Sequence, residues 1–215
     1  ILLLVTVILG LSTSATARAD GGRQGTPRLV AYYAGWATYS GRDIAQIDAS
    51  RLTHLIYAFA NIGADGRIAV GDPTVDTLKL FPGWSVSDPF FGNFGELHKL
   101  KQRHPHLKVL IAVGGWSWSG RFSDVALTEE SRRQFAESVV DFVVRFDFDG
   151  VDIDWEYPVS GGLATNARRP EDKQNFTLLM EELRRQLDAR GELDGKQYLL
   201  TFAGAAASYY TNNIE

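Results

Sequence analysis

The stretch DFDGVDIDWEYP, from Asp147 to Pro158, places five carboxylates within ten residues, beside side chains that strongly favour β-strands. Residues 150–155 are expected to form a strand, in which successive side chains point to opposite faces with a rise of about 3.3 Å per residue. One face would then pack on helices, while the other would point acids into the interior of a sheet or barrel. The apolar face is Val151, Ile153 and Trp155, and the acidic face is Asp152, Asp154 and Glu156.

Neighbouring acids on this face cannot all be ionised, because a nearby like charge and removal from water both raise a carboxyl pKa. We therefore expect one of them to hold a proton near neutral pH, as a general acid must. A solvated edge strand, a calcium-binding loop and a structural ion-pair network are alternatives. Bulky Ile153 and Trp155 argue against an exposed edge, and the position of the glycine argues against a calcium loop. Catalysis is the favoured interpretation.

The composition is that of a globular domain: of 215 residues, 45% are hydrophobic and 22% are charged. A formal net charge of −4 gives no basic surface for nucleic acid or an anionic membrane, so a neutral polymer would suit the protein as a partner. Cysteine is absent, so the core and not disulfides must stabilise the fold. The four histidines show no metal spacing with the acids, and neither a metal nor a cofactor is expected; they are His54, His98, His104 and His106.

The first residues predict export. An apolar run from Ile1 to Leu11 is followed by small polar residues and by Ala17-Arg18-Ala19, a pattern typical of signal-peptidase sites. The run is too short for a membrane span of about 20 residues, which favours a signal peptide at 1–19 over an anchor. Neither Met nor a basic region precedes Ile1, so this signal is expected to be incomplete at its N-terminus. Residues 20–27 would form a tether, and the protein is expected to be secreted.

Strand and helix patterns alternate along residues 28–215, which indicates βαβ units and a parallel sheet, either open or closed. The expected strands are 28–35, 51–60, 108–113, 150–155 and 196–202. The expected helices are 42–49, 93–103, 128–146 and 170–190, the last of them stopped by Gly191. The long segment 61–92 follows the carboxyl end of the second strand, where ligands bind in parallel sheets.

The run Asp149–Glu156 resembles the DxxDxDxE signature of family 18 glycoside hydrolases, the chitinases, and Tyr157-Pro158 extends the match. Similarity to the bacterial type covers nearly all of the chain after the signal. It includes Tyr33 and Trp36, Tyr57-Ala58-Phe59, Val113-Gly114-Gly115-Trp116-Ser117 and Arg169–Asn175. The resemblance implies an α/β fold, a (β/α)8 TIM barrel, of which residues 28–215 would hold about the first five βα units. A whole barrel usually needs about 250 residues.

The resemblance also implies a chemistry, in which β-1,4 bonds between N-acetylglucosamine units of chitin are hydrolysed with retention and assistance from the substrate. Glu156 would protonate the glycosidic oxygen and then serve as the base for water. Asp154 would hold the 2-acetamido group of the substrate, whose carbonyl oxygen attacks the anomeric carbon. Asp152 would share a proton with Asp154, and Asp149 would be structural at the base of the strand.

Substrate contacts are expected from residues at strand ends, where aromatic rings can stack on sugars and glycines can let a sugar approach the backbone. These residues are Tyr33, Phe59, Gly114, Gly115, Trp116, Ser117 and Tyr157. The sequence departs from the family at Ala112, where the SxGG pattern has a serine whose hydroxyl lies beside the carboxylates. A hydroxyl that would tune the pKa of the acids is therefore absent at this position.

The expected partners are chitin or chito-oligosaccharides, with no nucleic acid and no membrane after signal cleavage, and the protein is expected to be a monomer. Two alternatives share the signature: a carbohydrate-binding protein without catalysis, and an endo-β-N-acetylglucosaminidase acting on N-glycans. Five βα units would leave strand edges and an apolar surface uncovered. The 215 residues by themselves are therefore expected to be unstable or to aggregate, and need not be active.

Overall fold

The computed structural model describes residues 27–85 and 87–215. The expected signal peptide at 1–19 and residues 20–26 of the tether lie outside the described residues. Among the described helices, none combines the length and the apolar character that crossing a membrane requires.

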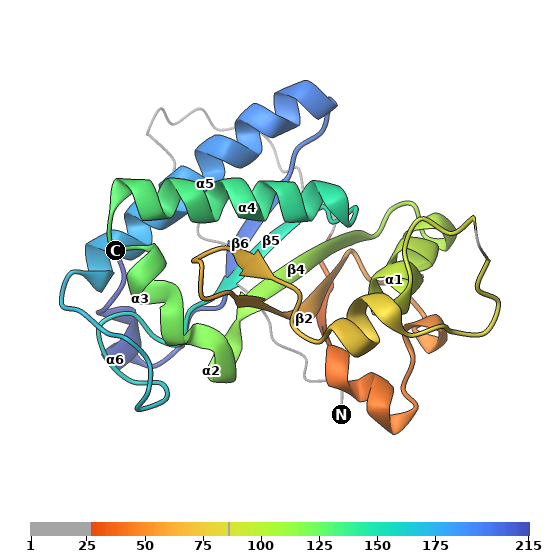
Figure 1. The fold of residues 1–215 in the computed structure, drawn as a ribbon, viewed down its shortest axis with the longest axis horizontal. Helices are drawn as coiled ribbons and strands as arrows, with labels where there is room; N and C mark the ends of the chain where they lie inside the picture. Colours follow the sequence, from red (N-terminus) through yellow and green to blue (C-terminus); the bar gives the residue numbers. More distant parts are fainter. Residues whose placement is uncertain (1–26, 86) are drawn as a thin grey trace.

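Five parallel strands form the sheet, in the order β1-β2-β4-β5-β6 (Figure 1). Each strand lies beside the next parallel strand of the chain, so the order never reverses, as it would in a doubly wound sheet. A short strand, β3, pairs antiparallel with the end of β2. This is the strand order of a TIM barrel, and the sheet is a partial barrel. The strands are β1 Val30–Ala34, β2 His54–Ile62, β3 Ile68–Ala69, β4 Lys108–Gly114, β5 Gly150–Asp154 and β6 Leu199–Phe202.

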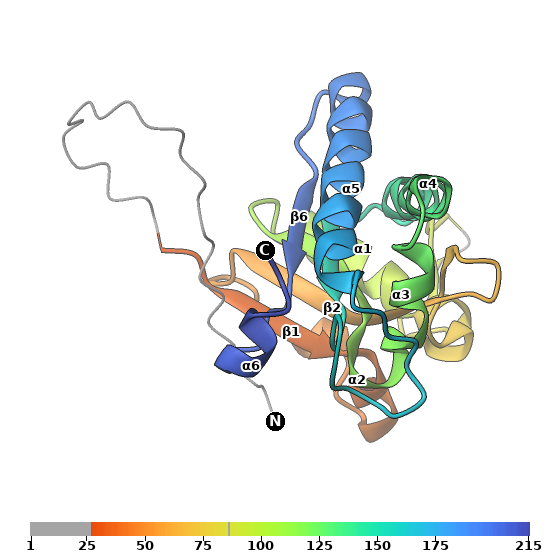
Figure 2. The same ribbon diagram turned by 90° about the vertical axis from the view of Figure 1, so that its left-hand side faces the viewer.

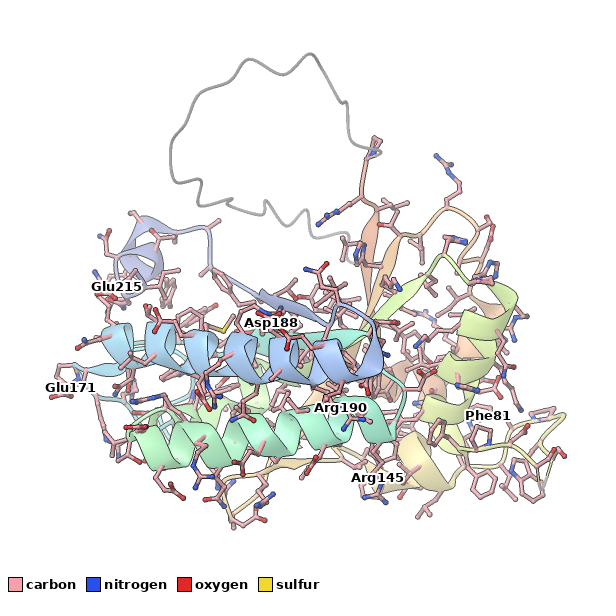
Figure 3. All side chains as sticks on the ribbon, turned by 90° about the horizontal axis from the view of Figure 1, so that it is seen from above. Phe81, Arg145, Glu171, Asp188, Arg190 and Glu215 are labelled. Atoms are coloured by element: carbon pink, nitrogen blue, oxygen red, sulfur yellow. The ribbon has the colours of Figure 1, made fainter. Side chains whose placement is uncertain are left out.

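Three long helices cover one face of the sheet: α1 Gly92–Arg103, α4 Glu129–Arg145 and α5 Asp172–Asp194. Figure 3 shows α4 and α5 side by side and running in the same direction, as successive crossover helices of parallel βα units must. The remaining turns are short and lie in the connections. They are η1 Gly35–Ser40, η2 Ile44–Gln46, η3 Thr74–Leu78, α2 Gly115–Trp118, η4 Ser119–Arg121, α3 Phe122–Val125 and α6 Ser208–Thr211.

The start of α4 follows from local chemistry. Thr128 Oγ1 accepts a hydrogen bond from the Ser131 backbone N–H at 3.0 Å, while Ser131 Oγ accepts one from the Thr128 N–H at 3.0 Å. This reciprocal capping box satisfies two backbone donors that a helix start leaves free. An apolar stripe with 3.6-residue periodicity is buried on one side of the helix; its members are Phe135, Val139, Phe142 and Val143.

The C-terminal end of α5 differs from the prediction. The helix does not stop at Gly191 but continues to Asp194 and ends at Gly195, whose φ of 65° is the left-handed conformation of a helix cap. At Gly191, the absence of a side chain instead allows the backbone of Lys196 to pack closely against the helix. A Cβ there would lie 2.4 Å from the backbone oxygen of Lys196, which leads the chain into β6. Either glycine could end a helix by its residue type. Only the packing against the start of β6 shows that Gly195, and not Gly191, ends α5.

Two further expectations are corrected. The expected helix at 42–49 is only the three-residue turn η2, Ile44–Gln46, in which Ile44 is buried. The segment 61–92 is not one loop: β2 extends to Ile62, and β3 and η3 follow. The five expected parallel strands and the helices at 93–103 and 128–146 are confirmed with small differences at their ends.

We expect Gly191→Ala to lower the free energy of unfolding by about 1–3 kcal/mol, although alanine favours helices by about 1 kcal/mol. The added methyl group meets the Lys196 backbone oxygen, which cannot move without displacing β6. Urea denaturation would measure the change. Glu181→Ala, on the exposed face of the same helix, is the matched control and should stay within about 0.5 kcal/mol of the wild type. An equal effect of the two substitutions would contradict the packing argument.

Candidate active site

The alternation predicted for β5 is confirmed. Ile153 and Trp155 are buried in the main core together with residues of α4 and α5, and the Trp155 ring stacks on Phe122 with centroids 5.5 Å apart. The intervening acids therefore face the other side of the sheet. That side carries a separate apolar cluster of Ile56, Ala58, Leu110 and Ala112, which corresponds to the interior of the barrel.

Asp152 is buried and accepts two hydrogen bonds from hydroxyl groups. Tyr32 Oη donates to Asp152 Oδ2 at 2.5 Å, and Thr201 Oγ1 donates to Asp152 Oδ1 at 2.5 Å. Tyr32 lies on β1, and Thr201 lies on β6. Ala112, directly opposite Asp152 in the β4–β5 ladder, contributes no hydroxyl. Both carboxylate oxygens are nevertheless satisfied, so the missing family serine does not leave Asp152 without donors.

The contact between Tyr32 and Asp152 requires a strongly curved sheet. Because β2 and β4 lie between β1 and β5, a flat sheet with strands about 4.8 Å apart would separate β1 from β5 by about 14 Å. A tyrosine side chain cannot span that distance within the plane. The hydrogen bond therefore crosses the concave interior of the sheet, as in a barrel wall.

Asp154 is also buried, and its Oδ1 atom has no hydrogen-bond partner within the described part of the chain. Burial raises the pKa of Asp154 well above its ordinary value, and the negative charge of Asp152 raises it further. The neutral, protonated form of this carboxyl is thereby favoured. An unsatisfied buried oxygen is costly, so this atom is suited to meet a hydrogen-bond donor from a ligand.

Glu156 lies just beyond the end of β5 and is half-buried. Burial raises the pKa of its carboxyl, while the hydroxyl of the neighbouring Tyr157 lowers it. The Tyr157 ring stacks on Tyr210 with centroids 4.0 Å apart, which ties this segment to α6. Figures 1 and 2 show α2 and α6 at the same end of the sheet, where the strands have their carboxyl ends.

Asp149 lies at the opposite end of β5 from Glu156. Its Oδ2 atom accepts a hydrogen bond from the Val109 backbone N–H at 2.9 Å and lies 3.0 Å from Lys101 Nζ. These contacts join β5 to β4 and α1. The position agrees with the structural role expected for this acid.

The expected substrate contacts divide into exposed and buried residues. Trp116 is 52% exposed, and the neighbouring Ser117 is also exposed. Phe59 lies on the interior side at a register shift of β2 and stacks at 6.1 Å on Trp36, which is 60% exposed. Three aromatic side chains thus lie around the carboxyl ends of the first parallel strands, partly open to solvent.

The expectation for Tyr33 is wrong. Its ring is buried in the main core, and its hydroxyl bonds to Thr38 Oγ1 at 2.9 Å and to the Arg42 backbone oxygen at 2.6 Å. Tyr32, one residue earlier, takes the interior position. A shift of one residue exchanges the faces of a strand, so sequence proximity did not distinguish the two tyrosines.

The interpretation of the two glycines is also corrected. A Cβ on Gly114 would lie 2.5 Å from the Phe122 ring, and a Cβ on Gly115 would lie 2.6 Å from the Phe59 ring. Their backbones have φ of 101° and 70°, which other residues rarely adopt. The space of the missing side chains is therefore filled by protein and not left for a sugar.

Three residues of the site were not assigned from the sequence: Tyr32, Thr201 and Ser119. Thr201 is a polar residue inside an apolar strand, which is a usable signal in YLLTF. To assign Tyr32 to the site, one would have to know the pairing register of β1 with β2, in which Tyr32 lies opposite the interior residue Ile56. Ser119 carried no signal beyond its place in GGWSWS. Over residues 27–85 and 87–215, no group of three or more His, Cys, Asp or Glu side chains is placed to hold a metal ion.

Comparison with protein families gives a match to the model described as glycosyl hydrolases family 18, over residues 28–214. Chitinase A1 of Niallia circulans is 47% identical, with 87% of this chain and 31% of the relative covered. Chitinase 1 of Aphanocladium album is 35% identical, with 97% and 49% covered. The chain thus spans about a third to a half of the length of these curated relatives.

Solved structures give the same result. Chitinase ChiA74 from Bacillus thuringiensis superposes with a TM-score of 0.82 at 41% identity, covering 86% of this chain and 36% of that one. A family 18 N-acetylglucosaminidase from Paenibacillus barengoltzii has a TM-score of 0.70 at 36% identity, covering 86% and 48%. At these identities the similarity extends beyond the general barrel architecture.

We expect Asp154→Asn to raise the free energy of unfolding near pH 7–8 and to change it little near pH 4. Because the pKa of Asp154 is raised in the folded protein, the folded state binds more protons than the unfolded state once the pH exceeds the ordinary aspartate pKa of about 3.9. The contribution of Asp154 to stability therefore falls with rising pH through this window, and the asparagine removes that loss. Urea denaturation at a series of pH values measures the difference. A gain that is the same at every pH would contradict the raised pKa.

Proposed function

Because this chain belongs to family 18 of the glycosyl hydrolases, we propose that it hydrolyses the β-1,4 linkages of chitin, with Glu156 as the catalytic acid and base. The observation that carries the proposal is the arrangement on β5. Asp154, a buried carboxyl with one oxygen that no described residue hydrogen-bonds, lies two residues before a half-buried carboxyl, Glu156, at the carboxyl end of a barrel strand. This is the end of the barrel where such folds bind their substrates.

The first step is proton transfer with assistance from the substrate. Glu156 donates its proton to the glycosidic oxygen as the bond to the anomeric carbon breaks. The carbonyl oxygen of the substrate's own 2-acetamido group attacks that carbon and forms an oxazolinium ion. Asp154 accepts a hydrogen bond from the acetamido N–H through its free Oδ1 atom, which orients the group and stabilises the positive charge that develops.

In the second step, Glu156 accepts a proton from a water molecule that attacks the anomeric carbon on the face opposite the departing carbonyl oxygen. Two inversions give net retention of configuration. Asp152 shares a proton with Asp154, so that these two carboxyl groups together carry fewer than two negative charges. The hydroxyls of Tyr32 and Thr201 stabilise the charge that remains on Asp152.

The exposed ring of Trp116 and the stacked rings of Trp36 and Phe59 offer apolar faces for pyranose units. The proposed substrate is chitin or a chito-oligosaccharide bound across these rings. We also propose export directed by residues 1–19, on the sequence pattern alone.

A binding protein without catalysis is the main competing function. The glutamate at position 156 argues against it, since a general acid is needed only for hydrolysis. An endo-β-N-acetylglucosaminidase would use the same acids on an N-glycan. Release of sugars from chito-oligosaccharides but not from an N-glycoprotein distinguishes the two hydrolases.

The proposal is tested by Glu156→Gln in the whole protein to which these residues belong. Loss of the proton donor should lower kcat for a fluorogenic chito-oligosaccharide by at least about 10³-fold, with a smaller effect on KM. Asp147→Asn is the matched control, because it makes the same chemical change at a carboxylate bonded to His98 at the other end of the sheet. Turnover by Glu156→Gln at the wild-type rate would exclude Glu156 as the acid.

We expect Tyr157→Phe to move the alkaline limb of the kcat–pH profile to higher pH. The Tyr157 hydroxyl lowers the pKa of Glu156, so its removal lets the carboxyl keep its proton to a higher pH. The phenyl ring can still stack on Tyr210. A shift to lower pH would show that the hydroxyl does not stabilise the ionised carboxylate.

A further inference from the structure

Glu156 lies where the sheet no longer holds the backbone. The β4–β5 ladder ends with Gly114 opposite Asp154, and the β5–β6 ladder ends with Ile153 opposite Phe202. Within the described part of the chain, the residues that follow Asp154 pair with neither β4 nor β6. The carboxyl that must meet a glycosidic oxygen is therefore attached to backbone outside the regular sheet.

Beyond the end of β4, the Ser119 side chain bonds the backbone that follows β5. Its side chain is fully buried, and its Oγ atom accepts a hydrogen bond from the Glu156 backbone N–H at 2.8 Å. The same hydroxyl lies 2.9 Å from the Asp154 backbone oxygen and 2.8 Å from that of Gly115, and it donates its single proton to these two acceptors. One hydroxyl thus joins the exit of β4 to the backbone on both sides of Trp155.

Asn166 bonds the backbone carbonyl of Glu156. Its Nδ2 donates to the Glu156 backbone oxygen at 3.1 Å, and its side chain is buried. The next residue, Ala167, donates its N–H to the Gly120 backbone oxygen at 3.2 Å, which anchors this loop to η4. Both backbone polar groups of Glu156 are consequently bonded to buried side chains.

We propose that Ser119 and Asn166 form a backbone clamp that positions the Glu156 carboxyl for proton transfer. The inference rests on the proposed function of Glu156. Neither clamp residue is catalytic, because the contacts of both with this segment are to backbone atoms. They act by fixing where the strand extension ends, and a displacement of about 1 Å at a reacting group can cost about 10²-fold in rate.

The test uses Ser119→Ala in the whole protein. We expect kcat for a fluorogenic chito-oligosaccharide to fall by about 10- to 100-fold, with KM changed by less than about 3-fold. The alkaline limb of the kcat–pH profile should also move to lower pH. Burial is what raises the pKa of Glu156, and a less restrained carboxyl is better solvated and loses its proton earlier.

Ser138→Ala is a matched control. Ser138 is also a buried serine whose Oγ accepts a backbone N–H from another element, Ile68 at 3.0 Å, and donates to a carbonyl of its own helix, Phe135 at 2.7 Å. It lies on α4, away from the acids. Its replacement should lower the thermal transition much as Ser119→Ala does, while kcat and the pH profile stay at wild-type values.

Asn166→Ala provides a second route that does not depend on Ser119→Ala folding. It releases the Glu156 carbonyl and should likewise lower kcat and move the alkaline limb to lower pH. The clamp is overturned if folded variants at both positions, or at Asn166 alone, keep kcat and the pH limb within about 2-fold and about 0.2 pH units of the wild type. If Glu156→Gln is inactive in that case, only the clamp fails; if Glu156→Gln retains turnover, the proposed function fails instead.

Discussion

The hydrogen bonds of Tyr32 and Thr201 to Asp152 are the contacts on which the site depends. The bond from Tyr32 crosses the interior of the sheet, and the bond from Thr201 comes from the neighbouring strand β6, so the first and last parallel strands meet at one buried carboxylate. A carboxylate in an apolar interior is tolerated only when its oxygens are hydrogen-bonded. The curvature of the sheet supplies the Tyr32 donor, so the barrel geometry and the stability of the acid depend on each other.

The apolar packing of the outer face of β5 stabilises a strand whose inner face carries buried acids. Ile153 and Trp155 are held in the core beneath α4 and α5, and a strand cannot rotate without exposing them. Burying Asp152 and Asp154 opposes folding, while the apolar side chains between them favour it. The strand therefore keeps its acids inward at a cost in stability that the packing of its other face offsets.

Charge is limited within the carboxyl row by burial and by neighbouring carboxylates. The protonated form of Asp154 is favoured, because its carboxyl is buried away from water and lies beside the charge of Asp152. Glu156 lies farther along the chain and is half-buried. This gradient of solvation along one strand gives chemically identical groups different tasks. The connections after β4 and β5 complete the site, because they bind the backbone where the ladders stop.

The sequence by itself determined the parallel βα order, the inward direction of the acids on β5 and the places of α4 and α5 along the chain, because these follow from local patterns. Only the tertiary structure decided that Tyr32 and not Tyr33 faces the interior, that Thr201 donates to Asp152, and that Ser119 meets Glu156. Those contacts join residues 37 to 120 positions apart. They depend on strand register and sheet curvature, which no local pattern specifies.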